Sequence, residues 1–401
     1  MFVITLMILV FGIFMMKLFD QFIINPVTIS SLLWIVLLVS YNFINHGLYP
    51  LSDKFYVALL FWYIPFVLFF FIAALLQTPS IHYISNRPLS FLYSEGLMWF
   101  FMGCLSLFIV FKIRDVQQFS PTDFYRAIRQ LALARSRGEI ENVPSYMIHL
   151  NRICQFSYVL MFVHINKGVK LKGRYLFYGL VAIYILLGAN KFIIAKVLSA
   201  LFVLRAYKGN LHFAKILFLL ILMFFFFYAS ELLRRGSFSE DLGLLNFVYI
   251  YVLTPMPAFD SYILHSSSSM LFTSFDPGHH IFSNVLGMSE VNPDYFDQEN
   301  SVFVPLPTNV FTMMSSYYVD YKWLGLLFGG ALYGLFFGYI YLKSFFSEPF
   351  RILYASLFFV LVFQSFFDYL LTQQSRYNIS LVIVLFLIFY PFSLYVEKQQ
   401  K

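Results

Sequence analysis

The residues of this chain best suited to chemistry lie in one polar stretch, residues 231–322. It contains ten of the twenty Asp and Glu residues and the adjacent pair His279 and His280. A reaction that takes a proton from a hydroxyl group needs a base with a pKa near neutrality, which histidine has by default. His279 and His280 are therefore candidate catalytic bases, and Asp320 is a candidate carboxylate. The competing interpretation is that the histidines are hydrogen-bonded loop residues.

The segment 241–263 inside this stretch combines aromatic side chains with carboxylates. Tyr249 is its candidate substrate-binding residue, because aromatic faces stack on the C–H faces of sugars while acids bind hydroxyl groups. We expect an interfacial or re-entrant helix here, broken by Pro255 and Pro257. Tyrosines at a membrane interface are the alternative, since they are common there without any ligand.

The pattern of metal-ligating residues predicts neither a metal site nor a cofactor. Neighbouring residues on a helix point about 100° apart, so His279 and His280 do not share one metal easily. Cys104 and Cys154 both lie in or beside expected spans, which gives no disulfide framework and no cysteine metal site. We expect a metal-independent protein.

Arginine and lysine are distributed differently along the chain. Nine of the thirteen arginines fall on one side of the expected membrane topology, whereas only five of the fourteen lysines do. A planar guanidinium grips phosphate through two hydrogen bonds, so this side is expected to bind a phosphorylated ligand. Chance and contact with lipid headgroups are the alternatives. The candidate phosphate-binding residues are Arg126, Arg129, Arg137, Arg234 and Arg235; the last two could instead anchor a helix at the interface.

Three of these arginines belong to an expected amphipathic helix, residues 121–137. Ser120 and Pro121 are typical of a helix start, and Gly138 is typical of a helix end. At 100° per residue the apolar side chains share one face, and three arginines lie within about 80° of each other on the opposite face. The helix is expected on the outer membrane surface, as a diphosphate clamp or as a lipid-contacting surface helix. The apolar face consists of Phe124, Ile128 and Leu131.

The elements that must position these residues are membrane helices. With 60% hydrophobic and 12% charged residues, the chain lies outside the soluble range, in which about a quarter of residues are charged. We expect an all-α polytopic membrane protein with about eleven spans, some of them shorter than a ~30 Å hydrocarbon core requires. No cleavable signal peptide and no nucleic-acid motif is expected. The expected spans are 1–17, 27–47, 55–76, 91–113, 148–166, 175–190, 191–206, 212–230, 323–343, 351–371 and 378–396.

Basic residues in short loops set the expected orientation. They cluster in residues 167–174, flank the loop 205–215 and end the chain at Lys398 and Lys401, all on one side if the spans alternate. The positive-inside rule makes that side the cytoplasm. The N-terminus and both long polar segments are then periplasmic, and the C-terminus is cytoplasmic.

This topology divides the chain into five parts. Two of them are large periplasmic segments, and the other three are groups of transmembrane helices. The central group contains a short hairpin that turns at residues 188–191. The parts are 1–113 (N-terminal bundle), 114–151 (basic periplasmic helix and loop), 152–230 (central helices), 231–322 (large periplasmic loop) and 323–401 (C-terminal helices).

The end of the polar stretch leads into a span with glycine on one face. Gly330, Gly334 and Gly338 repeat every four residues, a spacing that permits close helix packing in membranes. We expect these glycines to contact a neighbouring helix.

Three features together resemble the Wzy-type oligosaccharide repeat-unit polymerases of bacterial surface polysaccharide synthesis. The first is the sequence P-T-N-V-F-T followed by Y-Y-V-D-Y-K-W-L-G, residues 307–325, similar to that family's N-x-x-T … D-(F/Y)-G-x-x-G region. The second is L-G-A-N-K, residues 187–191, at the start of a short span. The third is an arginine-bearing outer loop in each half of the chain. One departure is that Lys322 stands where the family has glycine.

The resemblance implies a GT-C-like fold and a bacterial inner-membrane enzyme. Its reaction would move a growing glycan from undecaprenyl diphosphate to the non-reducing end of another lipid-linked repeat unit. The implied partners are that lipid-linked oligosaccharide, membrane lipids and a chain-length regulator protein, with no nucleic acid. It adds Asn309, Thr312 and Lys191 to the candidate substrate-binding residues. An O-antigen ligase of the same fold and a lipid-linked oligosaccharide flippase are the alternatives.

Overall fold

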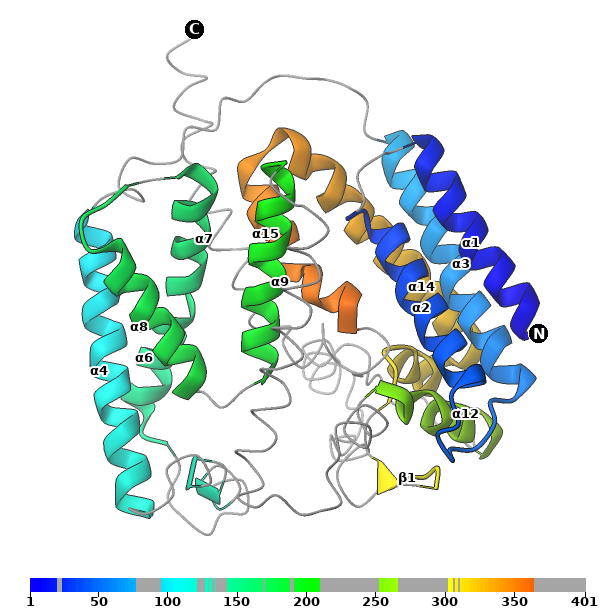
Figure 1. The fold of residues 1–401 in the computed structure, drawn as a ribbon, viewed down its shortest axis with the longest axis horizontal. Coiled ribbons are helices and arrows are strands. Elements are labelled where there is room, and N and C mark those ends of the chain that lie inside the picture. Colours follow the sequence, from blue (N-terminus) through cyan, green and yellow to red (C-terminus); the bar gives the residue numbers. More distant parts are fainter. Residues whose placement is uncertain are drawn as a thin grey trace, which may run out of the picture. The chain divides into compact units, whose positions relative to one another are not determined.

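The computed structural model consists of helices, with one very short strand pair among the residues that it describes (Figure 1). In that pair, β1 (Val302–Phe303) runs antiparallel to β2 (Pro307–Thr308). Apart from this pair, the expected all-helical class is confirmed for the described part of the chain. The described residues are 1–19, 24–76, 95–120, 127–128, 130–131, 134, 143–168, 170–187, 191–209, 252–265, 302–305, 307–308 and 311–363.

Five described helices are long and apolar enough to cross a membrane. The first three begin and end within four residues of the first three expected spans, and the fourth covers the described part of the span 91–113 but continues to Phe119. The fifth covers the expected span 323–343 and is longer. The five helices are α1 (Phe2–Phe19), α2 (Pro26–Phe43), α3 (Asp53–Leu76), α4 (Glu95–Phe119) and α14 (Met314–Phe346). The expected spans 212–230 and 378–396 lie outside the described residues. Of the span expected at 351–371, residues 351–363 are described and belong to α15 (Glu348–Phe363).

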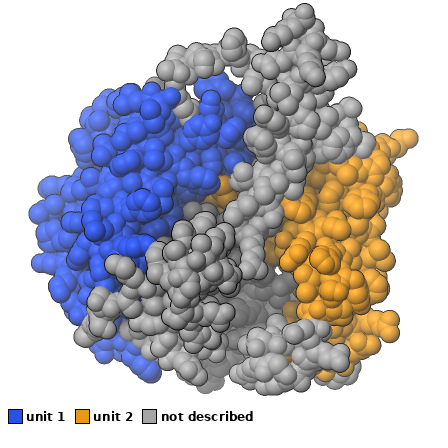
Figure 2. All heavy atoms as spheres, turned by 180° about the vertical axis from the view of Figure 1, so that it is seen from behind, with its two compact units in different colours: residues 1–83, 242–354, 360–383 blue, residues 84–241, 355–359, 384–401 orange. Residues whose placement is uncertain are grey.

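The chain forms two compact units, coloured separately in Figure 2. Unit 1 comprises residues 1–83, 242–354 and 360–383. Unit 2 comprises residues 84–241, 355–359 and 384–401.

Unit 1 is built on the pairing of α3 with α14, which Figure 1 shows beside α1 and α2. The glycine face of α14 lies directly on α3. A Cβ atom added at Gly330 would overlap the carbonyl oxygen of Trp62, and one at Gly334 would overlap that of Phe66. A Cβ at Gly338 would lie 3.0 Å from the Cβ of Ala73. The expectation that these glycines permit close helix packing is therefore confirmed.

The α2 helix has a well-defined start and ends earlier than expected. The side chain of Asn25 accepts a hydrogen bond from the Thr28 N–H at 2.7 Å, and Pro26 occupies the first turn, as is typical of helix N-termini. The helix stops at Phe43 rather than 47. In the loop that follows, His46 Nε2 lies 2.7 Å from the Tyr41 carbonyl oxygen, and His46 Nδ1 accepts from the Leu48 N–H at 3.0 Å.

In unit 2 the region of the expected span 148–166 is divided between two helices. They are α6 (Ser145–Gln155) and α7 (Ser157–Lys167), separated at Phe156. The hydroxyl of Ser157 donates to the Cys154 carbonyl at 2.6 Å. At the break the Phe156 N–H donates to the Ile153 carbonyl at 3.0 Å, the tighter bond that often ends an α-helix.

The two short helices expected after the basic loop are confirmed as separate elements, α8 (Arg174–Leu187) and α9 (Lys191–Tyr207). Their expected turn at 188–190 lies outside the described residues. The α7 helix ends at Gly168, whose φ of 68° is the left-handed conformation common after a helix.

The amphipathic helix expected at 121–137 is described in part. Residues 127, 128, 130, 131 and 134 are helical. Ile128 and Leu131 are buried in a cluster with Ala127 and Val116, against which Phe119 packs. The apolar face is thus confirmed at these two positions, while Phe124 and the three arginines lie outside the described residues.

Candidate functional site

The most unusual backbone of unit 1 is a bend inside α14. The helix begins at Met314, nine residues before the expected span, and its regular conformation is interrupted at Tyr321 (φ −139°, ψ 16°) and Lys322 (φ 53°, ψ −133°). A lysine with positive φ is strained, at a cost on the order of 1–3 kcal/mol. Such strain persists only where the surrounding structure imposes it, and it is concentrated at functional sites.

Two glycines allow the chain to fold tightly around this bend. A Cβ at Gly325 would overlap the carbonyl oxygen of Tyr317, and one at Gly329 would lie 2.7 Å from the ring of the same tyrosine. Any larger residue would push the two parts of α14 apart. The first part of the helix is therefore held against the start of the second.

The Lys322 ammonium is held by two aromatic rings. Its Nζ lies 5.1 Å from the ring centroid of Tyr318 and 5.7 Å from that of Tyr262, distances at which a cation–π interaction is favourable. Tyr262 belongs to α12 (Pro255–His265), in the long polar segment. The bend is thus connected to this segment by a charged side chain.

The expected break at Pro257 is wrong, because this residue lies inside the first turn of α12, whereas the helix begins at Pro255 and residues 241–251 lie outside the described residues. Pro255 is the first residue of α12, where the missing proline N–H costs nothing because first-turn N–H groups have no helical partner. The Ala258 N–H donates to the Thr254 carbonyl at 3.1 Å. Ala258 also packs with Val304 and Phe311 in a small core that joins α12 to the strand pair and to the start of α14.

A buried carboxylate ties α12 to the start of α3. Asp260 is 4% exposed and accepts hydrogen bonds from the Ser52 N–H at 2.7 Å and the Ser52 hydroxyl at 2.5 Å. Hydrogen bonds to a charged group contribute about 1.5–3 kcal/mol. The sequence analysis did not select Asp260; a carboxylate next to Phe259 in a largely apolar segment was the available signal.

Four polar residues around the start of α14 are almost fully buried. The exposed fractions are 0% for Thr312 and Ser315 and 2% for Ser316 and Asp320. The hydroxyls of Thr312 and Ser315 have no hydrogen-bond partner within the described part of the chain. A buried hydroxyl without a partner costs about 1–3 kcal/mol, so this region is not optimised for stability alone.

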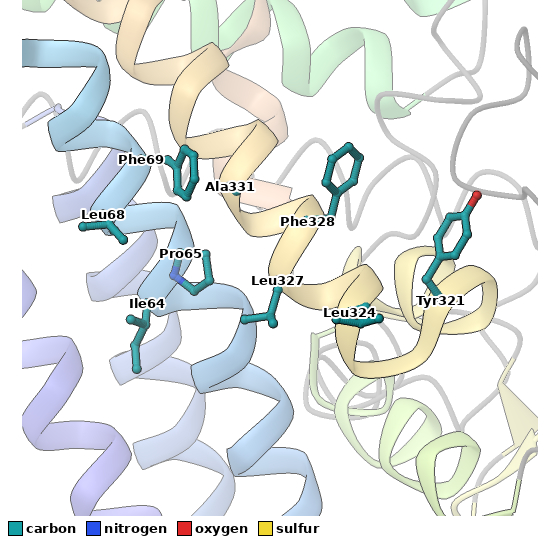
Figure 3. A pocket seen from close by; sticks show the side chains of 9 residues that line it. All are labelled: Ile64, Pro65, Leu68, Phe69, Tyr321, Leu324, Leu327, Phe328 and Ala331. Carbon is teal, nitrogen blue, oxygen red and sulfur yellow. The ribbon is translucent and has the colours of Figure 1, made fainter. Parts of the chain in front are cut away.

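An open apolar groove lies beside the bend, between α3 and α14 (Figure 3). Its volume is about 670 Å³. Tyr321 stands at one end, with its hydroxyl turned away from the α14 backbone. The remaining lining is hydrocarbon, so the groove suits an apolar chain. The lining residues are Ile64, Pro65, Leu68, Phe69, Tyr321, Leu324, Leu327, Phe328 and Ala331.

The structure describes few of the candidate residues named from sequence. Asp320 and Thr312 are both buried in unit 1, eight positions apart on either side of the first turns of α14. Lys191 begins α9 in unit 2, and its side chain lies outside the described residues. The candidates that also lie outside them are His279, His280, Arg126, Arg129, Arg137, Arg234, Arg235, Asn309 and Tyr249.

Unit 2 contains a buried lysine that sequence reasoning missed. Lys196, on α9, is 3% exposed, and its Nζ lies 4.7 Å from the ring centroid of Phe359. A lysine in the middle of an apolar helix is costly and was itself a signal, because such residues are rarely tolerated without a role.

No protein-family model, no curated protein and no solved structure matches this chain.

Proposed function

We propose that the chain is a lipid-linked glycan glycosyltransferase, a repeat-unit polymerase of a bacterial inner membrane with its active site on the periplasmic side. The observation that carries this proposal is the bend at Tyr321 and Lys322. The polymerase motif D-(F/Y)-G-x-x-G, aligned on Asp320, places its first glycine at Lys322 and its second at Gly325.

Both positions have the backbone geometry that glycine favours. Lys322 has φ 53° and ψ −133°, which glycine adopts without strain. Gly325 leaves no space for a Cβ atom. Lys322 therefore differs from the motif in residue type but has the backbone conformation that suits a glycine at this position. This agreement supports the resemblance.

The surroundings of the bend suit a lipid-linked substrate. The groove beside it has room for part of a polyprenyl chain, and the exposed side chains of Leu324 and Phe328 line it. Tyr262 and Tyr318 supply aromatic faces close to the bend. The diphosphate is assigned to the arginines of the two periplasmic segments, whose planar groups bind phosphate oxygens in pairs.

The proposed reaction breaks the bond between the anomeric carbon of the donor glycan and its diphosphate oxygen. A new bond forms from that carbon to an acceptor hydroxyl oxygen, the hydroxyl proton passes to a base, and the diphosphate leaves on its lipid. Arginine charges stabilise the leaving group most strongly where water is scarce. His279, His280 and Asp320 are the proposed base candidates.

The test uses a deletion strain complemented with wild type or variant, and analyses surface polysaccharide on gels. Asp320→Asn keeps the side-chain shape and removes the charge; we expect long chains to disappear while single-repeat product persists. Asp53→Asn is the matched control: it is the same substitution at a carboxylate that is 79% exposed and whose contact, at 3.5 Å, is with the terminal amino group. Membrane levels of each variant are compared by immunoblot.

Each result separates the candidate functions. Free polymer that remains on its lipid carrier in the deletion strain indicates a ligase, and unpolymerised lipid-linked repeats accumulating inside the cell indicate a flippase. A normal chain-length distribution in the deletion strain excludes all three. Arg126→Ala and Arg235→Ala test the diphosphate assignment in the same assay; normal chain lengths in both would refute it.

A further inference from the structure

One end of unit 2 has a strongly positive sequence composition. Three segments meet there, residues 95–99, 164–178 and 203–209, and together they contain six basic residues and a single acidic one. The described basic side chains are Lys170, Lys172, Arg174, Arg205 and Lys208, and the acidic residue is Glu95.

Hydrogen bonds bring these segments to the same place. The ammonium of Lys208, just after α9, donates to the carbonyl of Ile165 near the end of α7 at 2.5 Å. The Lys172 N–H, just before α8, donates to Glu95 Oε1 at the start of α4 at 3.4 Å. The basic residues of two different loops therefore form one surface, which we call the basic end of unit 2.

Aromatic residues mark this end as the level of lipid headgroups. Trp99 is 51% exposed and Tyr175 is 74% exposed. The indole of Trp99 lies beside Gly173, 3.5 Å from where a Cβ would stand, and the guanidinium of Arg174 lies 4.7 Å from the ring centroid of Tyr175. Exposed Trp and Tyr side chains are enriched where a protein crosses from hydrocarbon to headgroups.

Two of the basic residues at this end, Arg205 and Lys208, repel each other. Partial burial, and then the neighbouring charge of Arg205, lower the pKa of the Lys208 ammonium below its usual value. Lys170, Lys172, Arg205 and Lys208 are exposed. An anion bound beside Arg205 and Lys208 would relieve their repulsion, and the exposed aromatic side chains favour an anion attached to a hydrocarbon chain.

We propose that the basic end of unit 2 binds the phosphate groups of acidic phospholipids. Basic clusters between transmembrane helices on the cytoplasmic side hold such headgroups, each Lys or Arg contributing about fivefold in affinity. This inference does not depend on the proposed enzymatic function. It assigns unit 2 a lipid that remains bound and is not consumed.

The experiment is a titration of the purified, full-length protein with phosphatidylglycerol or cardiolipin, with bound lipid counted by native mass spectrometry. Phosphatidylcholine is the uncharged reference. The test variant is Arg205→Gln/Lys208→Gln. The matched control is Lys54→Gln/Arg114→Gln, which removes the same charge from exposed residues at other positions. Inorganic phosphate is included as a competitor.

We expect the wild type and the control to retain acidic lipid in preference to phosphatidylcholine, and the test variant to bind it at least tenfold more weakly. Equal binding by the test and control variants overturns the proposal, as does equal retention of phosphatidylcholine. Complete competition by millimolar inorganic phosphate also overturns it, because the ligand would then be a free anion. Thermal unfolding in detergent confirms that the variants are folded.

Discussion

The two parts of α14, before and after the bend at Tyr321 and Lys322, differ in how they pack. After the bend, the helix lies on α3 through glycines and apolar side chains. Before the bend it contains the buried Ser315 and Asp320, and Lys322 at the bend has a strained backbone. The second part maximises close packing, whereas the first retains buried polar groups and strain.

This difference suggests that the two parts are under different constraints. Close packing of glycine on a backbone is a stabilising device in a membrane, where no hydrophobic force drives helices together. Buried hydroxyls without partners and a positive-φ lysine reduce stability, so they indicate a constraint other than folding. The contrast can be tested by substitutions that affect one part and not the other.

The largest effect is expected at Gly334. Substitution by leucine would drive a side chain into the backbone of Phe66, and overpacking that the backbone cannot relieve costs about 3 kcal/mol or more. We expect Gly334→Leu to lower the unfolding temperature in detergent steeply. Gly103→Leu is the control, because the space around Gly103 on α4 is open among described atoms. Equal losses in both variants would contradict the close packing of α14 on α3.

An intermediate effect is expected at Lys322. Glycine relieves the positive-φ strain and alanine does not, so Lys322→Gly should be more stable than Lys322→Ala by about 1–2 kcal/mol. At Lys54, in the first turn of α3, the order should reverse, because glycine is less favourable than alanine in a helix by up to about 1 kcal/mol. Thermal or denaturant unfolding measures both pairs. If the alanine variant is the more stable one at both positions, the backbone at Lys322 is not strained.

The smallest effect is expected at Thr312. Valine has the same shape and removes a hydroxyl that has no described partner, so Thr312→Val should be neutral or stabilising by up to about 1 kcal/mol. Thr5→Val is the matched control, since the Thr5 hydroxyl is also buried but donates to the Met1 carbonyl at 3.3 Å. That variant should lose about 1 kcal/mol. If Thr312→Val shortens the polysaccharide without lowering stability, the hydroxyl serves function.

Sequence patterns predicted the parts of the fold that depend on local periodicity. The four-residue spacing of Gly330, Gly334 and Gly338 predicted a closely packed helix face, and the 100° periodicity predicted the buried positions of Ile128 and Leu131. Both signals arise within one helix. They require no knowledge of the residues across the contact.

Features that depend on contacts between distant parts of the chain, or on the backbone conformation of single residues, could not be predicted from the sequence. Asp260 holds Ser52, which is 208 positions away, and no local pattern links them. Lys322 is not a residue type that indicates positive φ, so no bend was expected there and the span was expected to start at 323. The break at Phe156 lies in a region whose apolar composition alone predicts one continuous span.

The contact between α3 and α14 also has a consequence for biosynthesis. Translation completes α3 long before α14 leaves the ribosome, so α3 must remain in the bilayer without its later partner. It is the more apolar of the two helices, which suits an independently inserted segment. The glycine-rich α14 then inserts beside a helix already in place. We expect assembly of unit 1 to be completed late in synthesis, when Tyr354 reaches the Ile24 carbonyl across 330 positions of the chain.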